Sequence, residues 1–257
     1  MDYATLAFLF ATGIVAGVFN SIAGGATFIS FPVLMASGLP PLVANATNFV
    51  ALLPSNAAAV PAFKNELLSL GRRLWIDLFI CAAGGIVGVL LLLKLGEGTF
   101  TTLVPWLMLI AVTIYALGNQ VRSFIQSIFS QNGSDVIGRV LLFCFSIYGG
   151  YFGAGLGVIL LASFTIAGYT NAHLANAIKN AAGTVISLVS IVVVASSGLV
   201  DWPYAIAMMV GATLGGAFGG GFSKKLSQKV MRGLVISFGL IVSAVYLWRA
   251  YGYLITG

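Results

Sequence analysis

Charged side chains are scarce in this sequence. Only 7% of its 257 residues are Asp, Glu, Lys or Arg, whereas soluble globular proteins carry about 25%. None of these four residue types occurs between Tyr3 and Phe63. A surface so poor in charge could not be kept in water, which excludes a soluble domain. The outer residues must face lipid instead, and the hydrophobic share of 60% is what a membrane protein requires.

Residues that carry chemistry are almost as scarce. The two cysteines, Cys81 and Cys144, lie in apolar runs without a partner at motif spacing, and we expect both to be buried structural thiols. The single histidine, His173, makes no metal site, and an interfacial residue or a proton sensor are its two interpretations. The sequence has no HExxH motif, phosphate loop or recoverable Ser–His–Asp set. We therefore expect no enzyme, no metal and no cofactor.

Eight apolar segments run through the chain, and the short connections between them carry the charges. Most of the charge-free runs fit the roughly 17–25 residues that a membrane-spanning helix needs. The segments are 5–37, 42–62, 74–93 and 101–118 in the first half, and 140–168, 174–197, 203–222 and 232–250 in the second half.

The two halves of the chain match when one is shifted by 131 residues without a gap. Ala44-Asn45-Ala46 falls on Ala175-Asn176-Ala177, and Lys94-Leu95 falls on Lys225-Leu226. Coincidence in a chain rich in Ala, Gly and Leu is the alternative explanation. Duplicated halves are common in secondary transporters. The match predicts a first repeat at 1–118, a cytoplasmic linker at 119–139 and a second repeat at 140–257.

Lys and Arg gather in the connections after the second and the seventh segment. Such residues accumulate in cytoplasmic loops, so both connections should lie in the cytoplasm. The net charge of +6 reflects this excess, and no basic patch interleaved with aromatics suggests a nucleic-acid partner. The basic residues are Lys64, Arg72 and Arg73 in one connection and Lys224, Lys225, Lys229 and Arg232 in the other.

Five segments separate these two connections, but two loops on one side of a membrane need an even number of crossings between them. Segment 140–168 is too long for one straight span and breaks at Gly149–Gly157, where glycine permits a turn. Its counterpart, segment 5–37, breaks at Ala23–Ala26. We predict an all-α integral membrane protein of two inverted repeats, each with three spanning helices and one glycine-broken re-entrant hairpin. Both termini would lie outside, and eight simple tilted spans are the alternative.

The two hairpin tips are the first candidate for a binding site. A helix that begins inside the membrane presents unpaired N–H groups and the positive end of its dipole, which suits an anion. Close packing of helices is the competing explanation for the glycines. Polar residues near the tips could complete one cavity with them. The candidate residues are Asn20, Ser21, Gly24, Gly25, Thr27, Asn45, Asn48, Gly153, Gly155, Gly157, Asn176 and Asn180.

Lys179 is the thirteenth candidate and the most informative residue. Between Val140 and Val200 it is the only charged side chain, so no carboxylate lies near it in the sequence. An ionisable group inside a membrane segment suggests a function, and a bound anion is its natural partner. The alternative is a side chain that extends to the cytoplasmic interface and has no role in binding.

Several motifs together resemble the TauE/SafE family of sulfite and organosulfur anion exporters. The resemblance covers nearly the whole chain. Its first-half motifs are Phe19–Pro32, Gly38-Leu39-Pro40-Pro41 and Ala44–Asn48, and the second-half counterparts are Gly149–Gly157 and Ala175–Asn180.

The resemblance implies a permease of the bacterial inner membrane for small sulfur-containing anions such as sulfite, sulfonates or thiosulfate. We expect it to contact lipid and a small anion, and the sequence is compatible with a homo-oligomer. An anion channel and a membrane scaffold or assembly factor are the alternative functions. The polar cavity around Lys179 argues against a scaffold.

Overall fold

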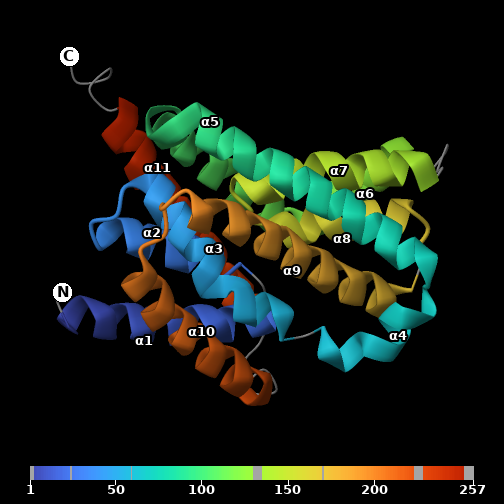
Figure 1. The fold of residues 1–257 in the computed structure, drawn as a ribbon, viewed down its shortest axis with the longest axis horizontal. Coiled ribbons are helices and arrows are strands. Elements are labelled where there is room, and N and C mark those ends of the chain that lie inside the picture. The colour runs from blue at the N-terminus through green and yellow to red at the C-terminus, as the bar shows by residue number, and fades with distance from the viewer. Residues whose placement is uncertain are drawn as a thin grey trace.

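The computed structural model describes residues 3–23, 25–58, 60–129, 135–169, 171–222 and 228–251. Helices are the regular elements of this part of the chain (Figure 1), which confirms the all-α prediction. In chain order they are α1 (Tyr3–Ala23), α2 (Thr27–Ala36), α3 (Pro41–Ala57), the 3-10 turn η1 (Pro61–Phe63), α4 (Lys64–Ser69), α5 (Arg72–Ala116), α6 (Gly118–Phe129), α7 (Asp135–Tyr151), α8 (Leu156–Ile166), α9 (Ala172–Ser196), α10 (Trp202–Phe222) and α11 (Gln228–Tyr251).

The outer surface of the helices is apolar, as a lipid-facing surface must be. Phe79 and Val192 are 73% and 70% exposed, and several other large apolar side chains are also turned outward. In the described ranges, three stretches are long and apolar enough to cross a membrane, and they lie at Tyr3–Asn20, Arg72–Ala116 and Ala177–Ser196. Cys144 is exposed on this surface, so the expectation that it is buried was wrong, whereas Cys81 is buried as expected.

Each of the two long apolar segments is divided into two helices at its glycine-rich run. Segment 5–37 forms α1 and α2, with Gly25 between them at φ +86°. Segment 140–168 forms α7 and α8, separated by Gly153 and Gly155 at φ +78° and +71°. A side chain is strained at such angles, so glycine is what allows the chain to turn there. Both breaks lie within the glycine runs from which the sequence predicted them.

The two hairpins open toward opposite ends of α5. Residues 72–95 of α5 are continuous helix, about 36 Å long at 1.5 Å per residue. At one end Glu97 accepts a hydrogen bond of 3.1 Å from the backbone N–H of Leu42, which follows α2. At the other end Arg73 pairs with Asp135 of α7 at 2.7 Å and donates to the carbonyl of Ala167 after α8. The exits of α2 and α8 are therefore separated by roughly the thickness of a bilayer core, about 30 Å.

A buried carboxylate fixes the second hairpin to α5. Asp77 is fully buried, and the Nε of Arg139 on α7 donates to its Oδ1 at 3.1 Å. The hydroxyl of Tyr169, after α8, donates to Oδ2 at 2.6 Å. Both oxygens of Asp77 thus have partners, one from each side of the hairpin, which is how a charge is accommodated in an apolar interior.

The stretch labelled α5 consists of two helices, residues 72–95 and 97–116, which meet at Gly96, whose φ of 70° and ψ of −177° are not helical. They coincide with the expected separate segments 74–93 and 101–118. The next connection differs from the sequence prediction. The expected linker 119–139 contains most of α6, which turns Phe124 and Ile128 outward, and the first residues of α7. Residues 130–134 of that linker lie outside the described part.

Glycines let helices of the two halves approach very closely. A Cβ on Gly88 of α5 would lie 2.0 Å from the carbonyl oxygen of Ile147 on α7, and one on Gly84 would lie 2.6 Å from that of Phe143. On the other side of the molecule, Gly215 of α10 meets Ile14 of α1 in the same way, at 2.0 Å. These spaced glycines serve packing, as small residues do in membranes. They bring α1 against α10 and α7 against α5. Each hairpin therefore packs against a helix from the other half of the chain.

We predict that Gly88→Ala lowers thermal stability. The added methyl collides with backbone that cannot move aside as a side chain can, and overpacking of this kind costs about 1–3 kcal/mol. The measurement is the fraction of detergent-purified protein that stays monodisperse after a temperature series. Gly233→Ala is the matched control, because a Cβ there meets nothing within 4 Å. Equal melting temperatures for the two variants would contradict the packing role.

We also predict that Ala36 and Asn171, each changed to cysteine in a background without Cys81 and Cys144, are labelled from opposite faces of the membrane. Ala36 ends α2 and Asn171 precedes α9, and both are exposed. Asn65 on α4 is the cytoplasmic reference and should share the face of Asn171. An impermeant maleimide on vesicles of known orientation makes the measurement. Eight simple spans would instead put Ala36 and Asn171 on one face.

Candidate functional site

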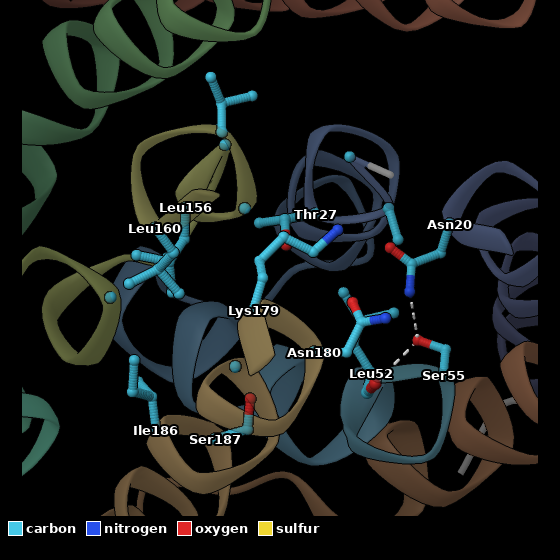
Figure 2. Close-up of a pocket in the computed structure, with 18 of the residues that line it drawn as sticks. Asn20, Thr27, Leu52, Ser55, Leu156, Leu160, Lys179, Asn180, Ile186 and Ser187 are labelled. Carbon is cyan, nitrogen blue, oxygen red and sulfur yellow. Dashed lines mark hydrogen bonds between the residues drawn. The ribbon is translucent and has the colours of Figure 1, made fainter. Parts of the chain in front are cut away.

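Both hairpin tips line one cavity of about 690 Å³ in the middle of the molecule. Helices α3 and α9 supply the rest of the principal wall (Figure 2). The two tips contribute Gly25 and Thr27, and Gly153, Gly155, Leu156, Gly157, Val158 and Leu160. The neighbouring helices contribute Asn20 from α1, Asn48, Phe49 and Ser55 from α3, and Lys179, Asn180, Ile186 and Ser187 from α9.

The breaks put the beginnings of two helices at the cavity. Helix α2 begins at Thr27 and α8 begins at Leu156, and both residues line it. The hydroxyl of Tyr148 donates to the carbonyl of Ala154 at 2.6 Å, which holds the second tip in its turn. The first N–H groups of a helix have no partner within it, and they carry the positive end of the dipole. The two tips therefore present positive potential to the cavity.

Lys179 extends into the cavity from α9. Figure 2 shows its side chain directed toward Thr27 of the first tip. Its hydrocarbon chain passes Gly157 of the second tip, where a Cβ would lie 3.6 Å from Cδ of Lys179, an ordinary van der Waals distance. Among the described residues, no carboxylate lies within 4 Å of its ammonium, and the ion pairs found there involve Arg73 and Arg139 instead. Within the described lining, Lys179 is the one charged side chain.

Amide and hydroxyl groups lie on one side of Lys179 in the cavity. The carboxamide oxygen of Asn48 accepts a short hydrogen bond from the hydroxyl of Ser30. The NH₂ group of Asn48 is therefore the part of the amide that is available to the cavity. The NH₂ group of Asn20 donates to the hydroxyl of Ser55 at 2.9 Å, which in turn donates to the carbonyl of Leu52 at 2.8 Å. Asn180 completes this polar side of the cavity in Figure 2. These groups can contact a ligand without adding charge.

Nine of the thirteen residues that the sequence singled out line this cavity. They are Asn20, Gly25, Thr27, Asn48, Gly153, Gly155, Gly157, Lys179 and Asn180. Gly24 and the side chains of Ser21 and Asn176 lie outside the described part of the chain.

The structure gives Asn45 a different place. It is 1% exposed and absent from the cavity wall, and its side-chain amide donates to the carbonyl of Tyr151 at 3.0 Å. Tyr151 ends α7, where the last carbonyl groups have no partner within the helix. The sequence interpretation placed Asn45 with Asn48 because both lie near the start of α3. Because the amide of Asn45 is hydrogen-bonded to the end of α7, it does not face the cavity.

The sequence analysis missed two hydroxyls of the cavity, Ser55 and Ser187. Each lies seven residues after an asparagine that was chosen, Asn48 and Asn180 respectively. Seven residues are about two helical turns, so the later side chain points to the same face. This spacing is the signal that could have found both serines.

Comparison with known proteins identifies the family of the chain. A family model described as "Sulfite exporter TauE/SafE" matches residues 9–247. The chain belongs to this family. The family resemblance read from the tip and asparagine motifs is thereby confirmed. No solved structure matches the chain at a significant level.

The relatives of this TauE/SafE protein are membrane proteins of bacteria. A "Probable membrane transporter protein" of Haemophilus influenzae is 28% identical over 246 residues, which cover 93% of each chain. "Probable membrane transporter protein YfcA" of Escherichia coli K12 is 26% identical over 260 residues, covering 96% of this chain and 91% of that protein. A shorter match, 30% identical over 166 residues, is to "Probable membrane transporter protein ORF9" of a Sinorhizobium species. The chain is thus a multi-pass membrane transporter of the bacterial inner membrane.

We predict that Asn45→Ala lowers the melting temperature and leaves anion binding intact. The change removes the hydrogen bond to the partly buried carbonyl of Tyr151, at a cost of about 1–3 kcal/mol. Asn48→Ala is the comparison, because it removes an amide from the cavity and should weaken binding instead. Thermal unfolding and anion titration of both variants give the test. If Asn45→Ala weakens binding more than Asn48→Ala does, our placement of the two residues is wrong.

Proposed function

We propose that this transporter carries small sulfur-containing anions, such as sulfite, a sulfonate or thiosulfate, and binds them in the cavity between the two hairpin tips. The observation that carries the proposal is Lys179, an ammonium that reaches into the cavity without a carboxylate beside it among the described residues. A buried charge needs a counter-charge or strong hydrogen bonds. An anionic substrate supplies both.

The remaining groups suit an oxyanion. The N-termini of α2 and α8 lie at the cavity and bring the positive ends of their dipoles to it, and the NH₂ of Asn48 adds a neutral donor. Helix N-termini bind sulfate-like and carboxylate groups without further charge, and broken helices in transporters use them in this way. Several donors around one cation fit a ligand with several acceptor oxygens.

We propose that the cavity is open to the cytoplasm in this conformation. Its wall reaches Ala58 and Phe63, next to the basic connection before α5. On the opposite side of the tips, the rings of Phe31, Phe100 and Phe152 pack against one another with centroids 5.3–6.5 Å apart. Phe31 lies one turn beyond Thr27 along α2, toward the end of the molecule where α2 exits. An aromatic layer thus separates the cavity from that end.

The proposed direction is export. An inside-negative membrane potential favours outward movement of an anion by about 2.3 kcal/mol per charge per 100 mV. The described lining offers no carboxylate pair that could couple the movement to a cation. The potential alone can drive such efflux. Saturation of the rate with substrate would distinguish this transporter from an anion channel.

Substitution of Lys179 tests the proposal. A hydrogen bond to a charged group is worth about 1.5–3 kcal/mol, so Lys179→Met should weaken sulfite binding roughly 10- to 100-fold. Lys179→Arg keeps the charge with another shape and should lose less. Lys94→Met is the control, since Lys94 is exposed and absent from the cavity wall. The measurement is affinity and efflux in liposomes with protein amounts matched. Unchanged sulfite affinity in Lys179→Met would show that Lys179 is not part of the binding site.

A further inference from the structure

The short helix of the second hairpin, α8, is anchored at both of its ends. At the tip, the hydroxyl of Tyr148 donates to the carbonyl of Ala154 at 2.6 Å. At the exit, the hydroxyl of Tyr169 donates at 2.6 Å to the buried carboxylate of Asp77, which also pairs with Arg139 of α7 at 3.1 Å. Hydrogen bonds weaken steeply away from their preferred geometry. These bonds therefore hold α8 in one position against α5 and α7.

The short helix of the first hairpin, α2, lacks these anchors. Under the shift of 131 residues, the counterparts of Asp77, Arg139, Tyr148 and Tyr169 are Met208, Phe8, Gly17 and Gly38, none of which has a side chain that can make the same bond. Among the described residues, the hydrogen bond from Ser30 to Asn48 is the one that ties a side chain of α2 to another helix. The other buried side chains of α2 are apolar, namely Phe28, Phe31, Pro32 and Leu34. Apolar contacts have no preferred direction, so they allow α2 to shift.

The backbone can turn at both ends of α2. Gly25 precedes this helix and Gly38 follows it, at φ +86° and +96°. Beyond these glycines the chain is held, because α1 is packed tightly on α10 and Glu97 binds the first turn of α3. Gly155 and Gly168 flank α8 in the same way, so the anchors distinguish the two helices and the hinges do not. Helix α2 can thus move as a unit between two fixed helices.

Ser30 connects α2 to the wall of the cavity. It is fully buried, and its hydroxyl donates to the carboxamide oxygen of Asn48, which lines the cavity. The same hydroxyl lies 3.0 Å from the carbonyl oxygen of Ala26, one turn earlier. If α2 leaves Asn48, the hydroxyl therefore keeps an acceptor within its own helix and is not left unpaired. The next residue is Phe31 of the aromatic layer, so one turn of α2 links the cavity to that layer.

We propose that α2 is the moving arm of the outer closure, that α8 stays fixed, and that the hydrogen bond from Ser30 to Asn48 is the latch that holds the arm closed. Movement of α2 carries Phe31 away from Phe100 and Phe152, and this opens the cavity toward the outside. The inference goes beyond the proposed function and rests on it in one point, which is that the aromatic layer closes the outer side.

Labelling of a cysteine inside the cavity tests the latch. Gly183 lines the cavity and a Cβ there meets nothing within 4 Å, so Gly183→Cys fits. The full chain without Cys81 and Cys144 is placed in vesicles of known orientation, and a membrane-impermeant methanethiosulfonate is added to the outer face. Ser30→Ala should raise the labelling rate about 5-fold, because loss of one hydrogen bond shifts the closed arm toward the open position by about that factor.

Ser163→Ala is the matched control. Ser163 of α8 is also fully buried, but its hydroxyl donates at 2.9 Å to the carbonyl of Ile159 in its own helix. This variant should be labelled at the parent's rate. Asn48→Ala removes the other partner of the latch and should raise the rate as Ser30→Ala does, which keeps the test available if Ser30→Ala does not fold. The double variant should show no further increase.

Distances between spin labels show which hairpin moves. Ala36 ends α2, Asn171 follows the exit of α8, and Leu90 on α5 is a common reference; all three are exposed. With saturating sulfite, the distance between labels at positions 36 and 90 should gain a second population. The distance between labels at positions 90 and 171 should keep a single one. Ser30→Ala should produce the second population for position 36 without sulfite.

The outcomes separate this inference from the proposed function. Faster labelling in Ser30→Ala and Asn48→Ala but not in Ser163→Ala, with movement at position 36 alone, supports the inference. If position 171 moves as far as position 36, both hairpins move and the inference is overturned. It is also overturned if the latch variants are labelled at the parent's rate. If sulfite changes neither distance while the latch variants are labelled faster, the proposed function fails and the inference stands.

Discussion

The fold depends on the need to satisfy backbone groups inside a membrane. Lipid offers no hydrogen bonds, so a helix can be interrupted there only where protein or a wet cavity surrounds the break. The break between α7 and α8 meets this condition through Tyr148, which donates to Ala154, and Asn45, which donates to Tyr151. Enclosing a break requires other helices to come close. Glycines allow α7 to touch α5 and α1 to touch α10. They therefore let neighbouring helices enclose the two breaks.

The same constraint explains where the cavity lies. A hairpin tip cannot fill the space in front of it with a continuing helix, and glycine at the tip adds no side chain. Gly25, Gly155 and Gly157 leave backbone as part of the wall. The cavity is thus the space that two interrupted helices leave between them. Its positive potential follows from the same geometry, because each interruption exposes the beginning of a helix.

The sequence predicts those features that depend on local chemistry. Glycine runs predict both breaks, and an isolated lysine predicts a charged cavity. It does not predict that Cys144 lies on the outer surface, because an apolar run does not say which of its side chains face lipid. Nor does it distinguish Asn45 from Asn48. Which of two neighbouring amides faces a cavity depends on where the end of α7 comes to lie, more than a hundred residues along the chain.

The difference between Asn48 and Lys179 has a consequence for transport. Under the shift of 131 residues the two occupy equivalent places, and both line the cavity. One half thus supplies a neutral donor and the other a cation, so the described lining carries a single positive charge. An ammonium held away from water costs several kcal/mol unless it has a counter-charge. A monovalent anion offsets that cost and makes the loaded site neutral, whereas a divalent anion leaves it negative. On the proposed function, closing an apolar layer such as Phe31, Phe100 and Phe152 over the site is easier when the site is neutral. The proposed site therefore favours singly charged anions and movement of the protein in the loaded state.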